Sequence, residues 1–517
     1  MATIDQQAGR SAHFSPITEL SIANLKCFSA PQTIPMAPLT LVYGPNSAGK
    51  STVLQALTLL ADAIDHRDGD VLHPHRSRID LGGLRALVHD HDPQKVITLG
   101  VASESAAIEY RIGLSFSDSG DSTWLAGVRA RGPETDGGTI GLIREGPPPD
   151  TSQYDADYIG YVFEDPASIV AWRDLLVAGL RDSGKTAGRL DALEGYTDPT
   201  FRDFLEHPST LQSLDRARLG DLRVYLYLGC LSDDHPSIPS SIIEGAPAPF
   251  AEYARDLVEL HGIDGPTRGF FSRVSEQLLT DRLAYLGPLR APPARYYTPR
   301  VSARGDGPSS GENVPHLIRD GGEVFCRTLN EWLKVLEIPY KIDVRSVDDE
   351  VMGTLSALRL QLIRAQASQA EESSSRPVVV SPADVGVGIG QVLPILVEGL
   401  TSRNKIICVE QPEVHLHPRL QAQLAEFLVA TACTKRSRDD SYRNQWVIET
   451  HSELLILRIQ KLIRTGKLSP EDVSVVYVHP GNGDGAQVLP LRLDEEGRFI
   501  DSWPSGFFED GLNEFLT

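Results

Sequence analysis

The stretch GPNSAGKS, residues 44–51, carries the clearest chemical pattern in the chain. The apolar run LTLVY precedes it and has strand character, and STVLQALTLLADAI follows with apolar residues at helical spacing. A strand, a glycine-rich loop and a helix in this order aim backbone N–H groups and the positive helix end at a phosphate. In the pattern G-x-x-x-x-G-K-[ST], the lysine reaches the β- and γ-phosphates and the hydroxyl ligates Mg²⁺. The expected nucleotide contacts are Gly44, Pro45, Asn46, Ser47, Ala48, Gly49, Lys50, Ser51 and Thr52.

The same pattern occurs a second time in GLRDSGKT, residues 179–186. The run before it, SIVAWRDLLVA, has helical rather than strand-like apolar spacing, and the segment after it is too polar to be buried against a sheet. We therefore interpret the second match as a solvated turn after a helix.

The run IICVE, residues 406–410, predicts a strand buried on both faces of a parallel sheet. Glu410 then stands at the carboxyl end of that strand, where open α/β sheets place their ligands. We expect it to hold Mg²⁺, or the water shell of the ion, together with Ser51. The next residue, Gln411, can orient a water molecule but cannot accept its proton at neutral pH. Glu413 could substitute for the missing base through a second water.

The stretch EVHLHP, residues 413–418, also raises the alternative of a metal site. Two histidines in the order His-x-His can ligate zinc from a strand. Pro412 and Pro418 flank the stretch and argue against a regular strand. We therefore do not expect His415 and His417 to bind a metal ion directly.

Two further segments have the character of phosphate-binding elements. The stretch QWVIETHS predicts a strand followed by a helix, which places His451 at a corner from which it could donate a hydrogen bond to a γ-phosphate. The stretch DVGVGIGQ, residues 384–391, leads into a helix that begins near Gln391 and forms a second helix N-terminus suited to phosphate. The expected contacts from this second loop are Gly386, Gly388, Gly390 and Gln391. One bound nucleotide does not need two phosphate-binding loops from the same chain. The second loop is explained if it contacts the nucleotide bound by a neighbouring copy of the protein.

These motifs together resemble the ABC-class ATPase heads of the SMC, Rad50 and OLD (overcoming-lysogenization-defect) branch. ITELSIANLKCF resembles the opening strand pair, DVGVGIGQ the signature loop, EQPEVHLHP the acid strand with the loop that crosses to a partner subunit, and ETHS the histidine switch. RIDLGGLRALVHDHD, YLGPLRAPPARYY and WPSGFFEDGL resemble a bacterial subgroup that lacks the OLD TOPRIM nuclease domain and often serves anti-phage defence. The 66 residues after His451 are too few for that nuclease domain (517 − 451).

The resemblance implies the α/β fold of an ABC-type P-loop ATPase head, and it covers residues 17–95 and 281–517. The segment between them resembles no family, and helical segments such as DPTFRDFLEHPSTLQSL, set between turn-rich stretches, predict a mostly helical insertion that splits the head. We expect the first half of the head at 14–115, the insertion at 116–275 and the second half at 276–517. The resemblance also implies ATP and Mg²⁺ as cofactors, and a two-fold dimer or a higher multiple in which the phosphate loop of one copy faces the signature loop of another. Gln411 stands where many relatives carry a catalytic glutamate, which implies slow hydrolysis. Gly390 stands where the subgroup often carries serine.

For function, the resemblance implies a regulatory ATPase that controls a separately encoded effector, a nuclease, in anti-phage defence. The alternative is an SMC-like ATPase that binds DNA in repair and acts without an effector. A third reading, the motor subunit of a membrane transporter, is disfavoured by the signature loop and the acid-strand loop.

The charge balance bears on these alternatives. A formal net charge of −21 argues against binding of DNA or anionic lipid over the whole surface. Residues 282–305, however, contain five arginines, three tyrosines and no acid. Arg290, Arg295, Arg300 and Arg304 suit contact with nucleic acid or a partner, and pairing with carboxylates elsewhere explains them equally well.

The cysteines, the N-terminal segment and the apolar runs indicate the cellular compartment of the protein. Five scattered cysteines predict a reduced protein, and the polar N-terminus does not have the pattern of a secretory signal. No apolar run of 18 residues predicts a membrane span. We expect a cytoplasmic protein.

Overall fold

The computed structural model describes residues 15–65, 72, 81–117, 120–135, 137–143, 158–165, 223–227, 282–290, 293–297, 314–349, 353–363, 378–433, 444–481, 483 and 485–504, with single residues and short runs between 167 and 280. The chain divides into two compact units. One comprises residues 1–32 and 59–281, and the other comprises residues 33–58 and 282–517. The second match to the phosphate-loop pattern, residues 179–186, lies outside the described residues.

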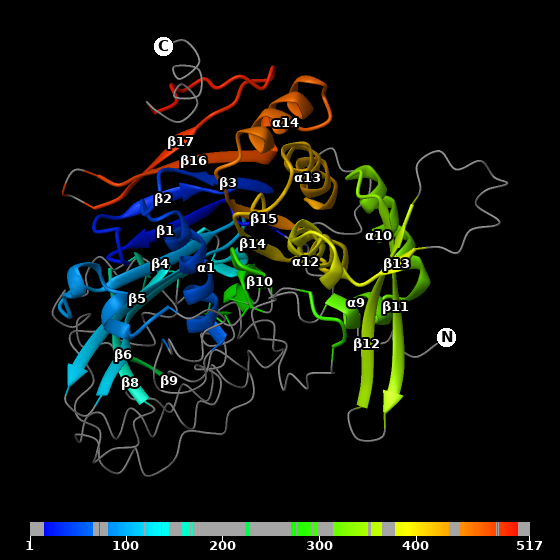
Figure 1. Ribbon diagram of the computed structural model, residues 1–517. Helices are drawn as coiled ribbons and strands as arrows, with labels where there is room; N and C mark the ends of the chain where they lie inside the picture. The colour runs from blue at the N-terminus through cyan, green and yellow to red at the C-terminus, as the bar shows by residue number, and fades with distance from the viewer. Residues whose placement is uncertain are drawn as a thin grey trace, which may run out of the picture. The chain divides into compact units, whose positions relative to one another are not determined.

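A six-stranded sheet organises the second unit, in the order β10-β14-β15-β3-β16-β17 (Figure 1). Its strands are β10 (Leu283–Leu286), β14 (Ile406–Glu410), β15 (Gln445–Glu449), β3 (Leu39–Tyr43), β16 (Val473–His479) and β17 (Gln487–Leu491). The first five are mutually parallel, and β17 pairs antiparallel with β16. Every residue of β3, β14 and β15 is buried, as their unbroken apolar runs predict. The predicted α/β fold is confirmed.

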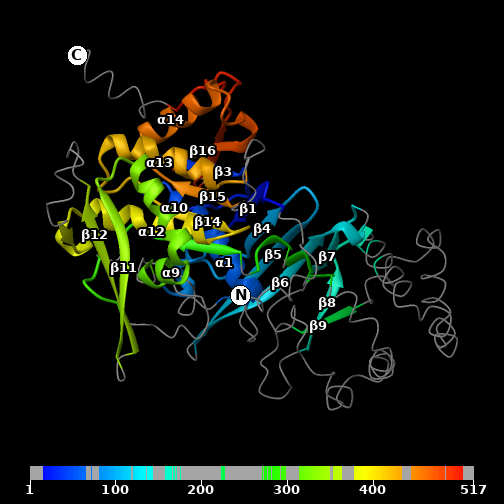
Figure 2. The ribbon, with the colours of Figure 1, turned by 90° about the vertical axis from the view of Figure 1, so that its right-hand side faces the viewer.

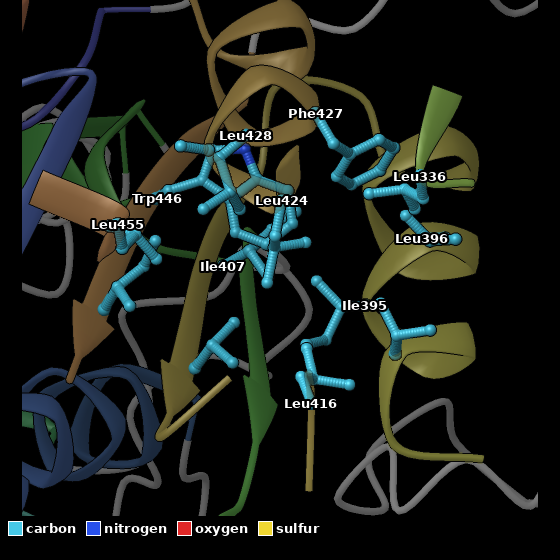
Figure 3. Packing of buried hydrophobic residues seen from close by; sticks show 14 of the residues in the cluster. Leu336, Ile395, Leu396, Ile407, Leu416, Leu424, Phe427, Leu428, Trp446 and Leu455 are labelled. Atoms are coloured by element: carbon cyan, nitrogen blue, oxygen red, sulfur yellow. The ribbon is translucent and has the colours of Figure 1, made fainter. Parts of the chain in front are cut away.

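Helices pack against this sheet through a buried apolar cluster. They are α9 (Val314–Asp320), α10 (Gly322–Val335), α12 (Val387–Thr401), α13 (Pro418–Thr431) and α14 (Glu453–Arg464). Figures 1 and 2 show α12, α13 and α14 beside β14, β15 and β3. Figure 3 shows Leu396 of α12 and Leu424 and Leu428 of α13 in the cluster with Ile407 of β14. This packing fixes the carboxyl ends of the central strands relative to the helices that follow them.

The starts of two of these helices are set by side-chain caps. The ring nitrogen Nδ1 of His417 accepts a hydrogen bond from the backbone of Arg419, and Pro418 is the first residue of α13. The hydroxyl of Ser452 accepts from the backbone N–H of Leu455 at the start of α14. The chain therefore turns sharply after β14 and again after β15, which leaves the intervening polar residues at one edge of the sheet.

An antiparallel sheet of β11 (Tyr340–Asp349), β12 (Gly353–Leu362) and β13 (Val379–Val380) also belongs to the second unit. β11 and β12 form a long hairpin beside α9 and α10 (Figure 1). Asn330 of α10 ties the hairpin to the helix, because its side chain exchanges two hydrogen bonds with the backbone of Ile342.

The first unit contains an eight-stranded sheet in the order β2-β1-β4-β5-β6-β7-β8-β9. The strands are β1 (Glu19–Ala23), β2 (Gln32–Pro35), β4 (Ile97–Ala102), β5 (Ala107–Ser117), β6 (Gly120–Arg131), β7 (Ile140–Ile143), β8 (Tyr158–Phe163) and β9 (Arg223–Tyr227). From β1 to β9 the neighbouring strands pair antiparallel. Helix α1 (Lys50–Asp65) spans the division between the units, and the apolar face expected for it is buried.

The segment expected as a mostly helical insertion, residues 116–275, is largely strand where the structure describes it, because β6, β7, β8 and β9 fall within it. The rest of that segment lies outside the described residues. The two compact units divide the chain at other points than the boundaries 14–115, 116–275 and 276–517, which stay predictions.

Aromatic residues join the C-terminal segment to the strand that precedes the phosphate loop. The ring of Trp503 lies edge-on to Tyr43 of β3, with centroids 5.6 Å apart, and to Tyr477 of β16 at 6.2 Å. Phe499 completes the group, at 4.8 Å from Trp503. The Tyr43 hydroxyl donates to the carbonyl oxygen of Ser452, 3.0 Å away. The segment after β17 therefore stabilises the base of the phosphate loop.

We predict that Trp503→Ala destabilises the protein by about 1–3 kcal/mol, because three ring contacts are lost and a gap is left beside Tyr43. Urea unfolding followed by circular dichroism measures the change. Ile500→Ala is the matched control, since Ile500 is 58% exposed. Equal unfolding midpoints for the two variants would contradict a structural role for Trp503.

Candidate functional site

The phosphate loop, residues 44–51, has the backbone conformation of an anion-binding loop. Gly44, Ser47 and Gly49 have positive φ angles of 146°, 63° and 107°. A side chain at Gly44 would also lie 2.4 Å from the carbonyl oxygen of Val478, so glycine is required there. The loop ends where α1 begins at Lys50, and the positive end of that helix suits a phosphate.

Lys50 is buried inside its own loop. Its ammonium group donates to the carbonyl oxygen of Pro45 at 2.8 Å. Burial lowers the pKa of Lys50, and the carboxylates of Glu449 and Glu413 act in the opposite direction. Lys50 and Pro45 lie near the start of the chain, and Glu413 and Glu449 lie near its end. The sheet therefore brings the lysine and the two acids to one place.

Ser51 pairs with an acid that the sequence reasoning passed over. The Ser51 hydroxyl donates to Oε2 of Glu449 at 2.6 Å. Glu449 is the last residue of β15, and it is only 3% exposed. β15 lies between β3 and β14 in the sheet, so Glu449 is one strand away from the strand of the phosphate loop. The signal available in the sequence was the acid directly before Thr450 in ETHS.

Glu410 lies at the end of β14, as predicted, opposite Glu449 in the parallel register. Its Oε1 accepts a hydrogen bond from the hydroxyl of Tyr285 on β10, the strand on the far side of β14 from β15. The edge of the sheet therefore carries two buried carboxylates, one directed to the phosphate loop and one to β10.

The turn after β14 holds Gln411 and Glu413 against the end of β15. Gln411 has a positive φ of 43°, and its backbone N–H donates to the carbonyl oxygen of Glu449 at 2.7 Å. Glu413 accepts from the Thr450 hydroxyl at 2.8 Å and from the backbone N–H of His451 at 2.6 Å. Burial raises the pKa of the Glu413 carboxyl despite these hydrogen bonds, which brings it nearer to the range of a general base.

His451 occupies the predicted corner between β15 and α14. Burial lowers its pKa, and the nearby charge of Lys50 lowers it further. Its Nε2 atom is buried and has no hydrogen-bond partner among the described residues. A buried ring nitrogen left without a partner beside Lys50 suits a ligand that offers an acceptor, such as a phosphate oxygen.

Arg290 connects the acid strand to the second helix N-terminus. Its guanidinium donates to the carbonyl oxygen of Glu410 at 2.7 Å, and its backbone exchanges two hydrogen bonds with the side chain of Gln391. Burial lowers its pKa to about 10, and the charge of Glu413 opposes that effect. Because Arg290 is only 3% exposed, the expectation that it contacts nucleic acid or a partner is wrong for this structure.

The structure describes one of the other three arginines that were expected to contact nucleic acid or a partner. Arg295 forms a two-pronged pair with Asp384, with one N···O distance of 2.9 Å. This supports the alternative in which the arginines pair with carboxylates. Arg300 and Arg304 lie outside the described residues.

The signature loop, residues 384–391, is tighter than its sequence predicts. Helix α12 begins at Val387 rather than near Gln391, with Gly386 at its N-cap. A side chain at Gly388 would approach the carbonyl oxygen of His415 to 2.9 Å, and one at Gly390 would approach Cγ of Pro293 to 2.5 Å. Pro293 thus occupies the space that a serine at position 390 would need.

Four residues of the signature loop were expected to contact the nucleotide, and the side chain of one of them, Gln391, points into the protein instead. Its side chain is buried against the backbone of Arg290, so its assignment to nucleotide contact needs correction. Gly386 is exposed, and nothing lies within 4 Å of a side chain built on it. It is therefore the position of the four best able to face another molecule.

The residue types at the edge of the sheet fit Mg²⁺ and a triphosphate. Ser51, Glu449 and Glu410 offer oxygen donors, which are the ligands Mg²⁺ prefers, and Lys50 and His451 offer nitrogen donors to phosphate. The described part of the chain holds no group of three or more histidine, cysteine, aspartate or glutamate side chains arranged to bind a metal ion. His417 instead caps α13, which gives its side chain a structural role.

Comparisons with known families give two matches to ATPase domains. Residues 39–162 match the model described as "AAA domain, putative AbiEii toxin, Type IV TA system", and residues 337–456 match the "AAA ATPase domain". Residues 468–517 match "Protein of unknown function (DUF3696)". No curated protein matches the chain.

Solved structures with similarity to the chain include SMC head domains. The Smc head domain with an extended coiled coil from Pyrococcus furiosus, bound to the C-terminal domain of ScpA, is 11% identical, with 97% of this chain and 100% of that chain covered and a TM-score of 0.33. The SMC head domain from Thermotoga maritima is 8% identical, with 92% and 100% covered and a TM-score of 0.33.

The described helices include none that is long and apolar enough to cross a bilayer. With the phosphate loop at the carboxyl edge of a parallel sheet and two matches to ATPase domains, the chain has the features of a P-loop ATPase.

We predict that Arg290→Lys destabilises the protein by about 2–4 kcal/mol, because a buried charged donor to a backbone carbonyl is lost and a shorter cation remains buried. Arg295→Lys is the matched control in the same segment; it alters an exposed pair and is expected to cost less than about 1 kcal/mol. Urea unfolding followed by circular dichroism measures both. Similar losses for the two variants would show that Arg290 does not join the two elements.

Proposed function

We propose that this chain is a regulatory ATPase that closes as a dimer around Mg²⁺-ATP and controls a separately encoded effector, a nuclease, in anti-phage defence. The observation that carries the nucleotide part is the convergence of Lys50, Ser51 and three acids at one edge of a parallel sheet. The defence part is supported by the match of residues 39–162 to a model whose description includes a toxin of the AbiEii type.

Within the proposed reaction, Lys50 leaves the carbonyl of Pro45 and binds the β- and γ-phosphates, while backbone N–H groups of the loop hold the same oxygens. His451 donates from Nε2 to an oxygen of the γ-phosphate. Bound Mg²⁺ supplies neutralisation of the charge that develops on the phosphates. Gln411 orients the attacking water, and Glu413, whose pKa is raised by burial, takes its proton through a second water.

Hydrolysis in this scheme is slow, because Gln411 cannot serve as a base and Glu413 reaches the attacking water only through a second water molecule. A directly placed base is worth ~10²–10⁴-fold in rate. Slow turnover suits a switch whose ATP-bound state must persist until the effector has been engaged.

The burial of Arg290 and the pairing of Arg295 with Asp384 favour this function over the alternative of an SMC-like repair ATPase that binds DNA directly. The net charge of −21 also disfavours direct binding of DNA.

We predict that Gln411→Glu raises the rate of phosphate release from ATP by at least about tenfold, because a base then adjoins the water. A steady-state phosphate assay at saturating ATP measures the rate. The control is Gln361→Glu, at an exposed position of β12, which adds the same charge away from the site and is expected to leave the rate of phosphate release unchanged. An unchanged or lower rate for Gln411→Glu would refute the explanation of slow turnover.

For the proposed dimer, we predict that Gly386→Gln abolishes association driven by ATP while leaving the fold intact. The position has open space around it and a φ of −56°, so a side chain is tolerated within one copy and would obstruct a neighbour. Gly83→Gln, at a second open glycine with a φ of −74°, is the control. Light scattering coupled to size exclusion, with and without ATP, reports the mass. A dimer that persists in Gly386→Gln would exclude this face from the interface.

A further inference from the structure

His451 lies in a short turn that neither a strand nor a helix holds. Strand β15 ends at Glu449 and helix α14 begins at Glu453, which leaves residues 450–452 outside both elements. The Nε2 atom of His451 is buried and has no hydrogen-bond partner among the described residues. The direction of the ring therefore depends on the contacts that fix the backbone of this turn.

The carboxylate of Glu413 holds this turn through two successive residues. Its Oε1 accepts from the backbone N–H of His451 at 2.6 Å, and its Oε2 accepts from the hydroxyl of Thr450 at 2.8 Å. Hydrogen bonds to an ionised acceptor are shorter and stronger than those between neutral groups. Because Glu413 follows the end of β14, the turn after one central strand holds the turn after its neighbour β15.

Other hydrogen bonds fix Ser452, on the far side of His451. The backbone N–H of Ser452 donates to the Thr450 hydroxyl at 3.0 Å, and its carbonyl oxygen accepts from the Tyr43 hydroxyl. The Ser452 hydroxyl donates to Gln421 of α13 at 2.8 Å. These bonds hold both neighbours of the histidine, and the bond from its own backbone N–H to Glu413 acts on the histidine directly.

Glu413 has acceptor sites for this contact and for its proposed part in hydrolysis. An ionised carboxylate offers about four acceptor sites, and the bonds to Thr450 and His451 leave some of them free. A free site can accept from a water molecule, as the proposed transfer of a proton requires. The two roles differ in reach, because Glu413 contacts the histidine turn directly and reaches the attacking water only through a second water molecule.

From these contacts we propose that Glu413 is a positioning residue, which holds His451 so that its Nε2 atom meets the γ-phosphate of bound ATP. The inference rests on the proposed nucleotide site and adds a second role for Glu413 within it. It also couples two parts of the site, since Glu413 belongs to the turn that carries Gln411. The residue that orients the water and the residue that binds the phosphate therefore move together.

The test compares the affinity for a non-hydrolysable ATP analogue with the affinity for ADP, both in Mg²⁺, by isothermal titration calorimetry of the full chain. His451 is proposed to meet only the γ-phosphate, so the ratio of the two affinities reports its placement without any contribution from hydrolysis. We expect Glu413→Ala to lower this ratio roughly tenfold, because the histidine turn is released. Glu413→Gln is expected to lower it less, since an amide oxygen can still accept from the His451 N–H.

A double-mutant cycle shows whether Glu413 acts through the histidine. His451→Ala is expected to lower the ratio by itself, and Glu413→Ala is then expected to cause no further loss. Removal of the negative charge alone would raise the ratio, because the analogue carries more negative charge than ADP. The control Glu331→Ala, at an exposed position of α10, is expected to leave the ratio unchanged.

An unchanged or raised ratio in Glu413→Ala would overturn the proposal, as would a further loss in the His451→Ala background. Equal losses in Glu413→Ala and Glu413→Gln would also overturn it, since both variants lack the base and only one lacks an acceptor for the N–H. Should Glu413→Ala fail to fold, Thr450→Val and Thr450→Ser decide, because only Thr450→Val removes the hydroxyl that donates to Glu413. A lower ratio in Thr450→Val alone supports the proposal, and equal ratios overturn it.

Failure of the proposed function gives a different result. If the unchanged protein binds neither nucleotide, or if Lys50→Ala binds both as tightly as the unchanged protein, the nucleotide site itself is wrong. If binding needs Lys50 but His451→Ala keeps the full ratio, the nucleotide site stands and only the positioning role of Glu413 is removed.

Discussion

The parallel pairing of β14, β15 and β3 is the constraint on which the rest of the site depends. Residues 39–43, 406–410 and 445–449 are far apart in the chain, and only their pairing brings their carboxyl ends to one edge. A shift of register by one residue would turn each of these side chains to the other face of the sheet. The complete burial of the three strands makes such a shift costly, since every position carries an apolar contact.

From that edge, hydrogen bonds extend in two directions. Toward the phosphate loop they run from Glu449 to Ser51, and from Glu413 to Thr450 and the backbone of His451. Toward α12 they run from the carbonyl of Glu410 through Arg290 to Gln391. A change in the turn after β14 is therefore felt at the start of α12, which carries Gly386. This gives a physical route by which the state of the nucleotide could alter the face offered to a second copy.

The sequence was most informative where backbone geometry alone determines the outcome. The phosphate loop, the strand that ends at Glu410 and the corner at His451 were all predicted, because glycine spacing and apolar runs mark turns and buried strands directly. The partners of those residues were not. No local pattern shows that Ser51 reaches Glu449 or that Arg290 is buried, since both depend on contacts between residues more than a hundred positions apart in the chain.

The signature loop also shows that a local sequence pattern does not identify the contacts of its residues. Its alternate glycines predicted an open loop for phosphate, whereas Gly388 and Gly390 are packed against His415 and Pro293. Glycine serves a turn and a close approach equally, and only the neighbour distinguishes them. Likewise, the described strands β6 to β9 fall where helical spacing predicted an insertion of helices.

Hydrogen–deuterium exchange of the full chain, with and without Mg²⁺-ATP, tests the central claim most directly. The account predicts slower exchange of the amides of residues 44–52 and 449–451 when nucleotide is present, because both segments contact the same phosphates. Slower exchange confined to other parts of the chain, with these two segments unchanged, would contradict a nucleotide site at this edge of the sheet.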